Sequence, residues 1–149
     1  MGVTILALDP GSEKRGFAIV HDDGTHGELG IVYVAELPRT LPRIIAQHQP
    51  EAIVVGEGTA AETVDDLVAS LQLGLPTHAV DETNSTREAR ERYWREHPPQ
   101  GFWRLIPLSL QTPPEPVDAY AAWVIGDRYL RHAARKSAPG VDSVNDGPR

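Results

Sequence analysis

The sequence contains no cysteine in 149 residues, which excludes disulfides and cysteine-ligated zinc. It also lacks an apolar run near the ~20 residues that a membrane-spanning helix requires, and its first residues show no secretory signal. Neither the hydrophobic content of 40% nor the charged content of 23% is typical of a disordered or fibrous chain. We therefore expect one globular, cytoplasmic domain with no membrane partner.

Basic residues are scarce, with 14 Lys and Arg against 21 Asp and Glu, and the net charge of -7 argues at first sight against nucleic acid. The charge is unevenly distributed. Residues 1–82 hold four basic and thirteen acidic residues, whereas residues 83–136 hold nine basic and six acidic. Nearly all of those nine are arginines, whose planar guanidinium fits phosphate oxygens in pairs. Two ordinary solvated helices would give the same balance, so charge alone does not identify the partner.

Apolar runs and turn signals predict an α/β fold. The expected strands cover residues 3–8, 16–20, 29–34, 52–55 and 78–80. The expected helices cover residues 41–48, 63–73, 85–97 and 117–134. Short links make the first three strands an antiparallel meander, and the later alternation adds two parallel strands. This gives a five-stranded mixed sheet with helices on both faces over residues 1–135, and residues 136–149 are expected to be a disordered tail.

Two local features add detail to this fold. Ser85 with Glu88 three residues later has the pattern of a capping box at a helix start. Residues 98–116 are rich in proline and glycine and contain Phe102 and Trp103. We expect this loop to cover an edge of the sheet, with base stacking or a dimer interface as alternatives.

Acidic residues stand where predicted strands end. Asp9, Glu57 and Glu82 each follow a strand, and ligands of open α/β sheets bind outside the carboxyl ends of strands. Asp118 shares the apolar stripe of the last helix, and a buried carboxylate is costly unless it is paired or binds a metal. Each acid alone has a structural explanation, as a turn former or a partner of a helix dipole.

Carboxylates without cysteine favour the hard cations Mg²⁺ or Mn²⁺. Two such ions ~3.5–4 Å apart can hold the attacking and leaving oxygens of a phosphodiester, which is nuclease chemistry. The predicted catalytic residues and metal ligands are Asp9, Glu57, Glu82 and Asp118. Glu57 should start close to Asp9, because its strand is adjacent. The residues expected to bind nucleic acid are Lys14, Arg15, Ser85, Thr86, Arg87, Arg90 and Arg104.

Three motifs resemble the YqgF (RuvX) family of Holliday junction resolvase-like proteins. The first is Ala7-Leu8-Asp9-Pro10-Gly11 followed by Lys14-Arg15-Gly16-Phe17-Ala18, similar to the family's opening strand, turn and strand. The second is Val80-Asp81-Glu82-Thr83-Asn84-Ser85-Thr86-Arg87-Glu88-Ala89. The third is Val117-Asp118-Ala119-Tyr120-Ala121-Ala122, similar to the family's final helix.

The resemblance covers residues 4–130 and implies a ribonuclease H-like fold and a metal-dependent nuclease. Its acids would be Asp9, Glu82 and Asp118, and its role would be maturation of the 5′ end of pre-16S rRNA or resolution of Holliday junctions. Thr83 stands where the family usually has arginine. Glu57 is an additional acid, more like the RuvC resolvases, whose fourth strand carries a catalytic glutamate.

Several alternatives remain open from sequence. A RuvC-type junction endonuclease is one, and it would be expected to form a homodimer in order to cut two strands symmetrically. A nucleotide-binding module of the actin or sugar-kinase type shares the opening strands but normally needs a second domain. A third is a nucleic-acid-binding protein that keeps the fold without cleaving. The expected partners are RNA, branched DNA or both.

Overall fold

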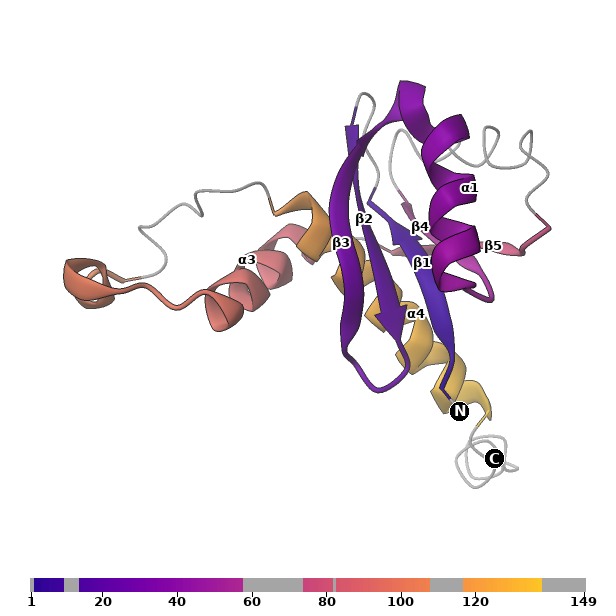
Figure 1. Cartoon of the computed structure of the whole chain (residues 1–149). Helices are drawn as coiled ribbons and strands as arrows, with labels where there is room; N and C mark the ends of the chain where they lie inside the picture. The colour runs from indigo at the N-terminus through magenta and orange to yellow at the C-terminus, as the bar shows by residue number, and fades with distance from the viewer. Residues whose placement is uncertain (1, 10–13, 58–73, 82, 108–116, 138–149) are drawn as a thin grey trace, which may run out of the picture.

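A computed structural model describes residues 2–9, 14–57, 74–81, 83–107 and 117–137 (Figure 1). Its strands are β1 (Thr4–Leu8), β2 (Lys14–His21), β3 (His26–Tyr33), β4 (Ile53–Glu57) and β5 (Thr77–Asp81). They form one five-stranded sheet in the order β3-β2-β1-β4-β5. The β1–β2 and β2–β3 pairs are antiparallel, and the β1–β4 and β4–β5 pairs are parallel. The predicted mixed sheet is confirmed.

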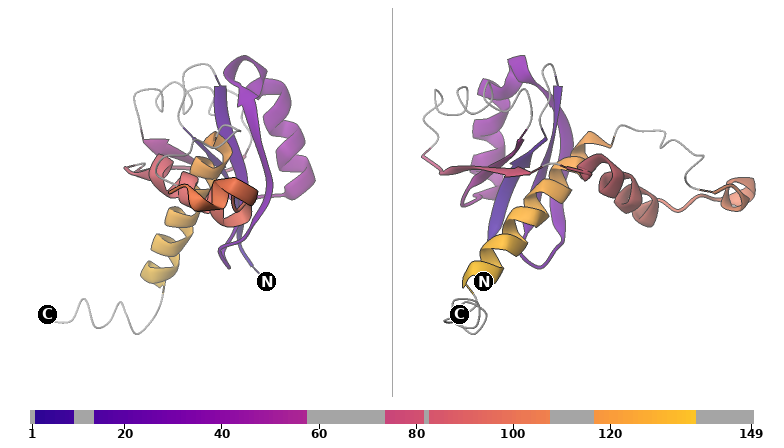
Figure 2. Two further views of the ribbon diagram at one scale, coloured as in Figure 1. Left: turned by 90° about the vertical axis from the view of Figure 1, so that its left-hand side faces the viewer. Right: turned by 180° about the vertical axis from the view of Figure 1, so that it is seen from behind.

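The central strands are apolar on both sides because helices cover both faces of the sheet (Figure 1, Figure 2). Along β1, Leu6 and Leu8 join the core under helix α1 (Leu37–His48), whereas Ile5 and Ala7 join the core under helix α4 (Asp118–Ser137). Along β4, Val54 packs on the α4 side. The alternation therefore assigns each strand residue to the α1 face or to the α4 face.

Helix α1 begins earlier than the sequence pattern suggests. Residues 41–48 were the expected span, with Pro50 as the closing signal. The helix instead begins at Leu37, so that Pro38 lies in its first turn, where a proline costs no hydrogen bond. Pro42 is inside the helix, and the complete burial of Leu37, Leu41 and Ile44 offsets its missing donor.

Helix α3 (Ser85–Glu96) packs on α4 through a small apolar cluster and a set of ion pairs. Arg92 donates to Asp127 at 2.9 Å and lies 4.5 Å from the ring centre of Trp123. Arg128 donates to the Glu88 carboxylate, also at 2.9 Å. These contacts fix one long side of α3 against α4 and leave its other side in solvent.

The predicted capping box is absent. Asn84, with a positive φ of 63°, is the N-cap residue and makes no side-chain capping bond. Ser85 is the first helical residue and is buried. A capping box needs Ser85 at the N-cap position, so it cannot form here, and the Glu88 carboxylate accepts a bond from Arg128 instead.

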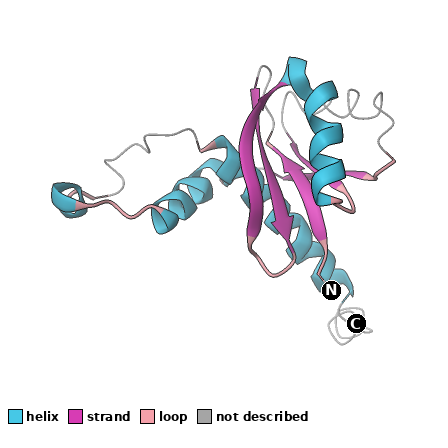
Figure 3. Cartoon of the chain, in the orientation of Figure 1, coloured by secondary structure: helices cyan, strands magenta, loops and turns pink. Residues whose placement is uncertain are grey.

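The described part of the aromatic loop, residues 98–107, does not cover the sheet. It holds the short helix η2 (Gly101–Leu105) at the end of an arm beyond α3, away from the sheet (Figure 3). Phe102, Trp103 and Leu105 are 68%, 58% and 79% exposed. The expected helix at 63–73 and the tail from 138 lie outside the described residues. No helix in the described part of the chain is long and apolar enough to cross a membrane.

Candidate metal and nucleic-acid site

Asp9 continues the ladder of β1 by one residue. Its backbone N–H donates to the Gly16 carbonyl at 2.9 Å, so that Asp9 and Gly16 lie opposite each other on adjacent strands. Asp9 follows Ile5 and Ala7 at two-residue spacing, and both of those pack on α4. The half-buried Asp9 side chain therefore starts on the α4 face of the sheet.

Gly16 brings Asp118 to the same place. A Cβ on Gly16 would overlap the backbone carbonyl of Asp118, the first residue of α4. Only glycine lets the helix start so close to the sheet. Gly16, the strand partner of Asp9, is therefore also the packing partner of the Asp118 backbone. The start of α4 thus lies next to the residue opposite Asp9, on the face of the sheet where the Asp9 side chain starts.

Glu57 lies elsewhere. The register pairs Leu8 with Val55, which puts Asp9 beside Gly56 and leaves Glu57 one residue further along. Ile53 and Val55 pack on the α1 side, and the same alternation puts Glu57 on the α1 face. Its side chain is exposed. The expectation that Glu57 starts close to Asp9 does not agree with this register, because the sheet lies between the two faces.

Glu82 lies outside the described residues, but the residues around it are described. The Asp81 carboxylate accepts hydrogen bonds from the N–H and the hydroxyl of Thr83 at 2.9 and 2.6 Å. These two bonds hold the pKa of Asp81 below its usual range. Arg128 donates to the Asp81 carbonyl at 2.9 Å, which ties the end of β5 to α4. Thr83, the departure from the family pattern, therefore closes a turn. No group of three or more potential metal ligands occurs among the described residues.

The two basic residues at the start of β2 have different surroundings. Lys14 is exposed beside the site. Arg15 is 1% exposed, and its Nη1 donates to the Asp9 carbonyl at 3.4 Å. A buried guanidinium is out of reach of a phosphate, so Arg15 suits the positioning of the Asp9 backbone better than the predicted contact with nucleic acid.

The remaining predicted nucleic-acid residues are on α3 and the arm. Ser85 is buried at the helix start, which leaves Thr86 as the exposed residue there. Arg87 and Arg90 are exposed on α3, and Arg104 is exposed on η2. The charge count of residues 83–136 did not separate these arginines from the inward-facing ones, because it does not show which side of a helix packs.

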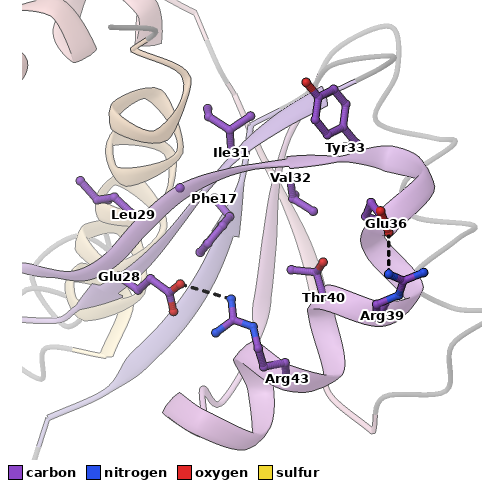
Figure 4. A pocket seen from close by; sticks show the side chains of 11 residues that line it. Phe17, Glu28, Leu29, Ile31, Val32, Tyr33, Glu36, Arg39, Thr40 and Arg43 are labelled. Carbon is purple, nitrogen blue, oxygen red and sulfur yellow. Dashed lines mark hydrogen bonds and ion pairs between the residues drawn. The ribbon is translucent and has the colours of Figure 1, made fainter.

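Two hollows in the described part of the chain lie away from Asp9 and Asp118. One, of about 450 Å³, lies between β3 and α1 (Figure 4). There Glu28 accepts bonds from Arg43 at 3.2 Å and from His48 at 2.9 Å. Burial works against ionisation of Glu28, but these bonds outweigh it and lower the pKa of that carboxyl. The other, of about 900 Å³, lies between β5 and the second half of α4 and includes Asp81 and Thr83.

No family model matches the chain. In sequence it is 37% identical over 79 residues to the transcriptional accessory protein Tex of Neisseria gonorrhoeae, a match covering 50% of this chain and 10% of Tex. It is 29% identical over 98 residues to the crossover junction endodeoxyribonuclease RuvC of Citrifermentans bemidjiense, covering 50% of this chain and 60% of that protein. The chain thus spans about a tenth of the length of Tex and three fifths of that RuvC.

Among solved structures, Thermus thermophilus RuvC in complex with a Holliday junction superposes with a TM-score of 0.54 at 19% identity, covering 87% of this chain and 96% of RuvC. Fowlpox virus resolvase in complex with Holliday junction DNA gives a TM-score of 0.54 at 12% identity, covering 88% of this chain and 99% of the resolvase. The chain therefore has the ribonuclease H-like fold of Holliday junction resolvases and is distantly related in sequence to Tex and RuvC.

Proposed function

We propose that this protein is a metal-dependent nuclease that hydrolyses phosphodiester bonds in structured nucleic acid. The observation that carries the proposal is that Gly16 pairs with the backbone of Asp9 and packs against the backbone of Asp118, which is what a site containing both carboxylates would require. Crowded carboxylates repel one another and are costly unless a cation is bound between them. The resemblance to RuvC in fold and sequence supports the same chemistry.

The donor set fits a hard cation. Asp9 and Asp118 supply carboxylate oxygens, and Glu82 is the proposed third ligand. Val80, two residues before Glu82, packs on the α4 side of the sheet, the side of Asp9. Mg²⁺ or Mn²⁺ bound by these residues would lower the pKa of a water nucleophile and stabilise the leaving oxygen. Arg15 holds the backbone of Asp9, and exposed Lys14 is placed to contact a phosphate.

The natural substrate is part of the same proposal. Pre-16S rRNA and Holliday junctions both combine duplex with strand exchange or unpaired segments, and both follow from the resemblance to the YqgF family. The two structural neighbours named above were solved with Holliday junctions. We therefore propose RNA, branched DNA or both as the partner, with a homodimer where two strands must be cut.

A second candidate is nucleic-acid binding without cleavage. It is favoured by one observation, the sequence match to Tex, a transcriptional accessory protein, which is the higher in identity of the two relatives described. On this alternative, the carboxylates at Gly16 would be vestiges of a nuclease site.

A cleavage assay separates the two. The full chain is incubated with Mn²⁺ and labelled single-stranded, duplex and four-way substrates of DNA and RNA, beside Asp9→Asn and Asp118→Asn. We expect the parent to cut at least one structured substrate and both variants to be inactive, because asparagine keeps the shape of aspartate but not its charge. Melting temperatures without metal should stay level or rise, since one repulsive charge is removed. Full activity in either variant would refute the assignment.

A further inference from the structure

The outward side of α3 and the arm is more basic than the sequence suggests. Residues 87–104 contain five arginines and three glutamates. Arg92 and Glu88 face α4, where they pair with Asp127 and Arg128. Glu96 accepts bonds from His26 and Tyr120. The exposed charges that remain are Arg87, Arg90, Glu91, Arg95 and Arg104. The segment has five arginines and three glutamates in sequence, but because some of these pack inward or are paired, the outward side carries four cations and one anion.

The arm ends in exposed aromatic rings on a tight turn. Phe102 and Trp103 are more than half exposed, and their ring centres lie 5.9 Å apart at 70°, an edge-to-face pair. The N–H of Trp103 donates to the Gln100 carbonyl at 3.2 Å, and Gly101 has a positive φ of 60° that closes the turn. Perpendicular rings cannot stack on each other, so the faces of the pair are oriented for other planar groups.

In the sequence, Arg104 stands between Trp103 and the next apolar residue, Leu105. Its Nε donates to the Gly101 carbonyl at 3.3 Å, which holds the guanidinium against the turn. Exposed aromatics beside cations are how proteins bind single-stranded nucleic acid: bases stack on the rings and arginines follow the phosphates. A large exposed apolar patch on a soluble chain is otherwise a liability.

We propose that α3 and the arm form a binding surface for a single-stranded segment of the nucleic acid, with unpaired bases stacking on Phe102 and Trp103 and phosphates on Arg87, Arg90 and Arg104. This inference rests on the proposed function and narrows its substrate class to nucleic acid with an unpaired stretch beside the cleaved bond. Helix α3 begins three residues after Glu82 and its 12 residues extend about 18 Å.

The test is equilibrium binding in EDTA, so that no cleavage is needed. The probes are a fluorescein-labelled 12-nucleotide single strand, as DNA and as RNA, and the blunt duplex of the same sequence. The variants are Phe102→Ala and Trp103→Ala. Leu105→Ala is the matched control, because it removes an equally exposed apolar side chain from the same turn but no aromatic face. Phe102→Tyr is the conservative variant that keeps the ring.

We expect each aromatic-to-alanine variant to raise the Kd for the single strand about tenfold or more, equivalent to about 1.4 kcal/mol. Leu105→Ala and Phe102→Tyr should stay within about twofold of the parent, and duplex affinity should not change. The DNA and RNA arms show which sugar is preferred. If the parent does not bind the single strand, or if the alanine variants bind it like the parent, the inference is wrong.

Sedimentation of the same samples tests the competing occupant, a second copy of this chain. A parent dimer that Phe102→Ala converts to a monomer would overturn the inference in favour of an interface between copies. The proposed function fails separately. If binding in EDTA depends on the rings but no Mn²⁺-dependent cleavage occurs, the binding surface stands and the nuclease proposal is wrong. If the parent cleaves but the ring variants bind the single strand like the parent, the nuclease proposal stands and the binding surface is wrong.

Discussion

At the scale of single residues, Gly16 connects the two carboxylates that define the candidate site. It accepts the backbone bond of Asp9 and contacts the backbone of Asp118. A side chain at this position would push the start of α4 away from the sheet. Gly16 was part of a sequence motif, but only the structure shows that its role is close approach between a strand and a helix.

Gly16→Ala is therefore expected to damage the site more than the fold. Overpacking at this contact should lower the free energy of unfolding by about 1–3 kcal/mol, and cleavage should fall further than the unfolded fraction explains, because Asp118 moves. Gly27→Ala is the control, since its Cβ would meet only side-chain atoms, of Ile19 at 3.3 Å and of His21 at 3.5 Å. Urea denaturation and the cleavage assay measure the two effects. Equal losses in both variants would mean that Gly16 has no special role at the site.

Asp9 and Glu57 both follow strands but lie on different faces of the sheet. Both acids end strands, and both were predicted as ligands. Side chains of a strand alternate between faces, so a shift of one residue in the register of β4 against β1 decides whether Glu57 meets Asp9. The run of apolar residues in β4 is buried on both sides and carries no trace of that register. The expectation that Glu57 starts close to Asp9 therefore does not agree with the register, whereas Asp9 and Asp118 remain predicted ligands.

At the scale of elements, the position of the arm depends on how α3 is held. Asp127 is almost completely buried and accepts bonds from Arg92 on α3 and from Arg131 on its own helix, at 2.9 and 2.8 Å. Arg128 links α4 to both α3 and the end of β5. In the sequence these arginines entered only the charge balance of residues 83–136, whereas in the structure they join helices.

Asp127→Ala should destabilise the protein by about 3 kcal/mol, because it leaves the largely buried guanidinium of Arg92 without its carboxylate. Glu36→Ala removes one partner of an exposed ion pair with Arg39, 3.6 Å apart, and should change stability by less than about 1 kcal/mol. Chemical denaturation of both variants gives the comparison. A loss of similar size in both would show that the α3–α4 link adds little to stability.

The elements differ in how well sequence predicts them, for physical reasons. The strands follow from apolar runs that the two-sided burial of the sheet imposes. The early start of α1 was missed because the sequence pattern does not show that Leu37 is buried in the core and that Pro38 lies in the first helical turn. The capping box does not form because the helix begins at Ser85 itself, with Asn84 as the N-cap residue. The position of the arm was not predicted, because we expected an apolar loop to pack against the sheet. That rule does not apply to a surface that we propose binds a ligand.

At the scale of the whole molecule, the sheet divides the chain into two sides with different tasks. The α1 side is a packed core with a polar groove at its margin that holds the paired Glu28. The α4 side carries Asp9, Asp118, the basic surface of α3 and the arm. The net charge of -7 conceals this arrangement, because many of the acids lie in residues 1–82 and most of the exposed arginines lie beyond them.

The central claim is that the metal site is on the α4 side and is formed by Asp9, Glu82 and Asp118. Titration of cleavage with Mn²⁺ in Glu57→Gln and Glu82→Gln tests it most directly, because the two variants remove the same charge from different places. We predict that Glu82→Gln reduces turnover by at least ~100-fold, on the order of 3 kcal/mol, and weakens Mn²⁺ dependence, while Glu57→Gln titrates and turns over like the parent. Loss of activity in Glu57→Gln with a normal Glu82→Gln would contradict the account.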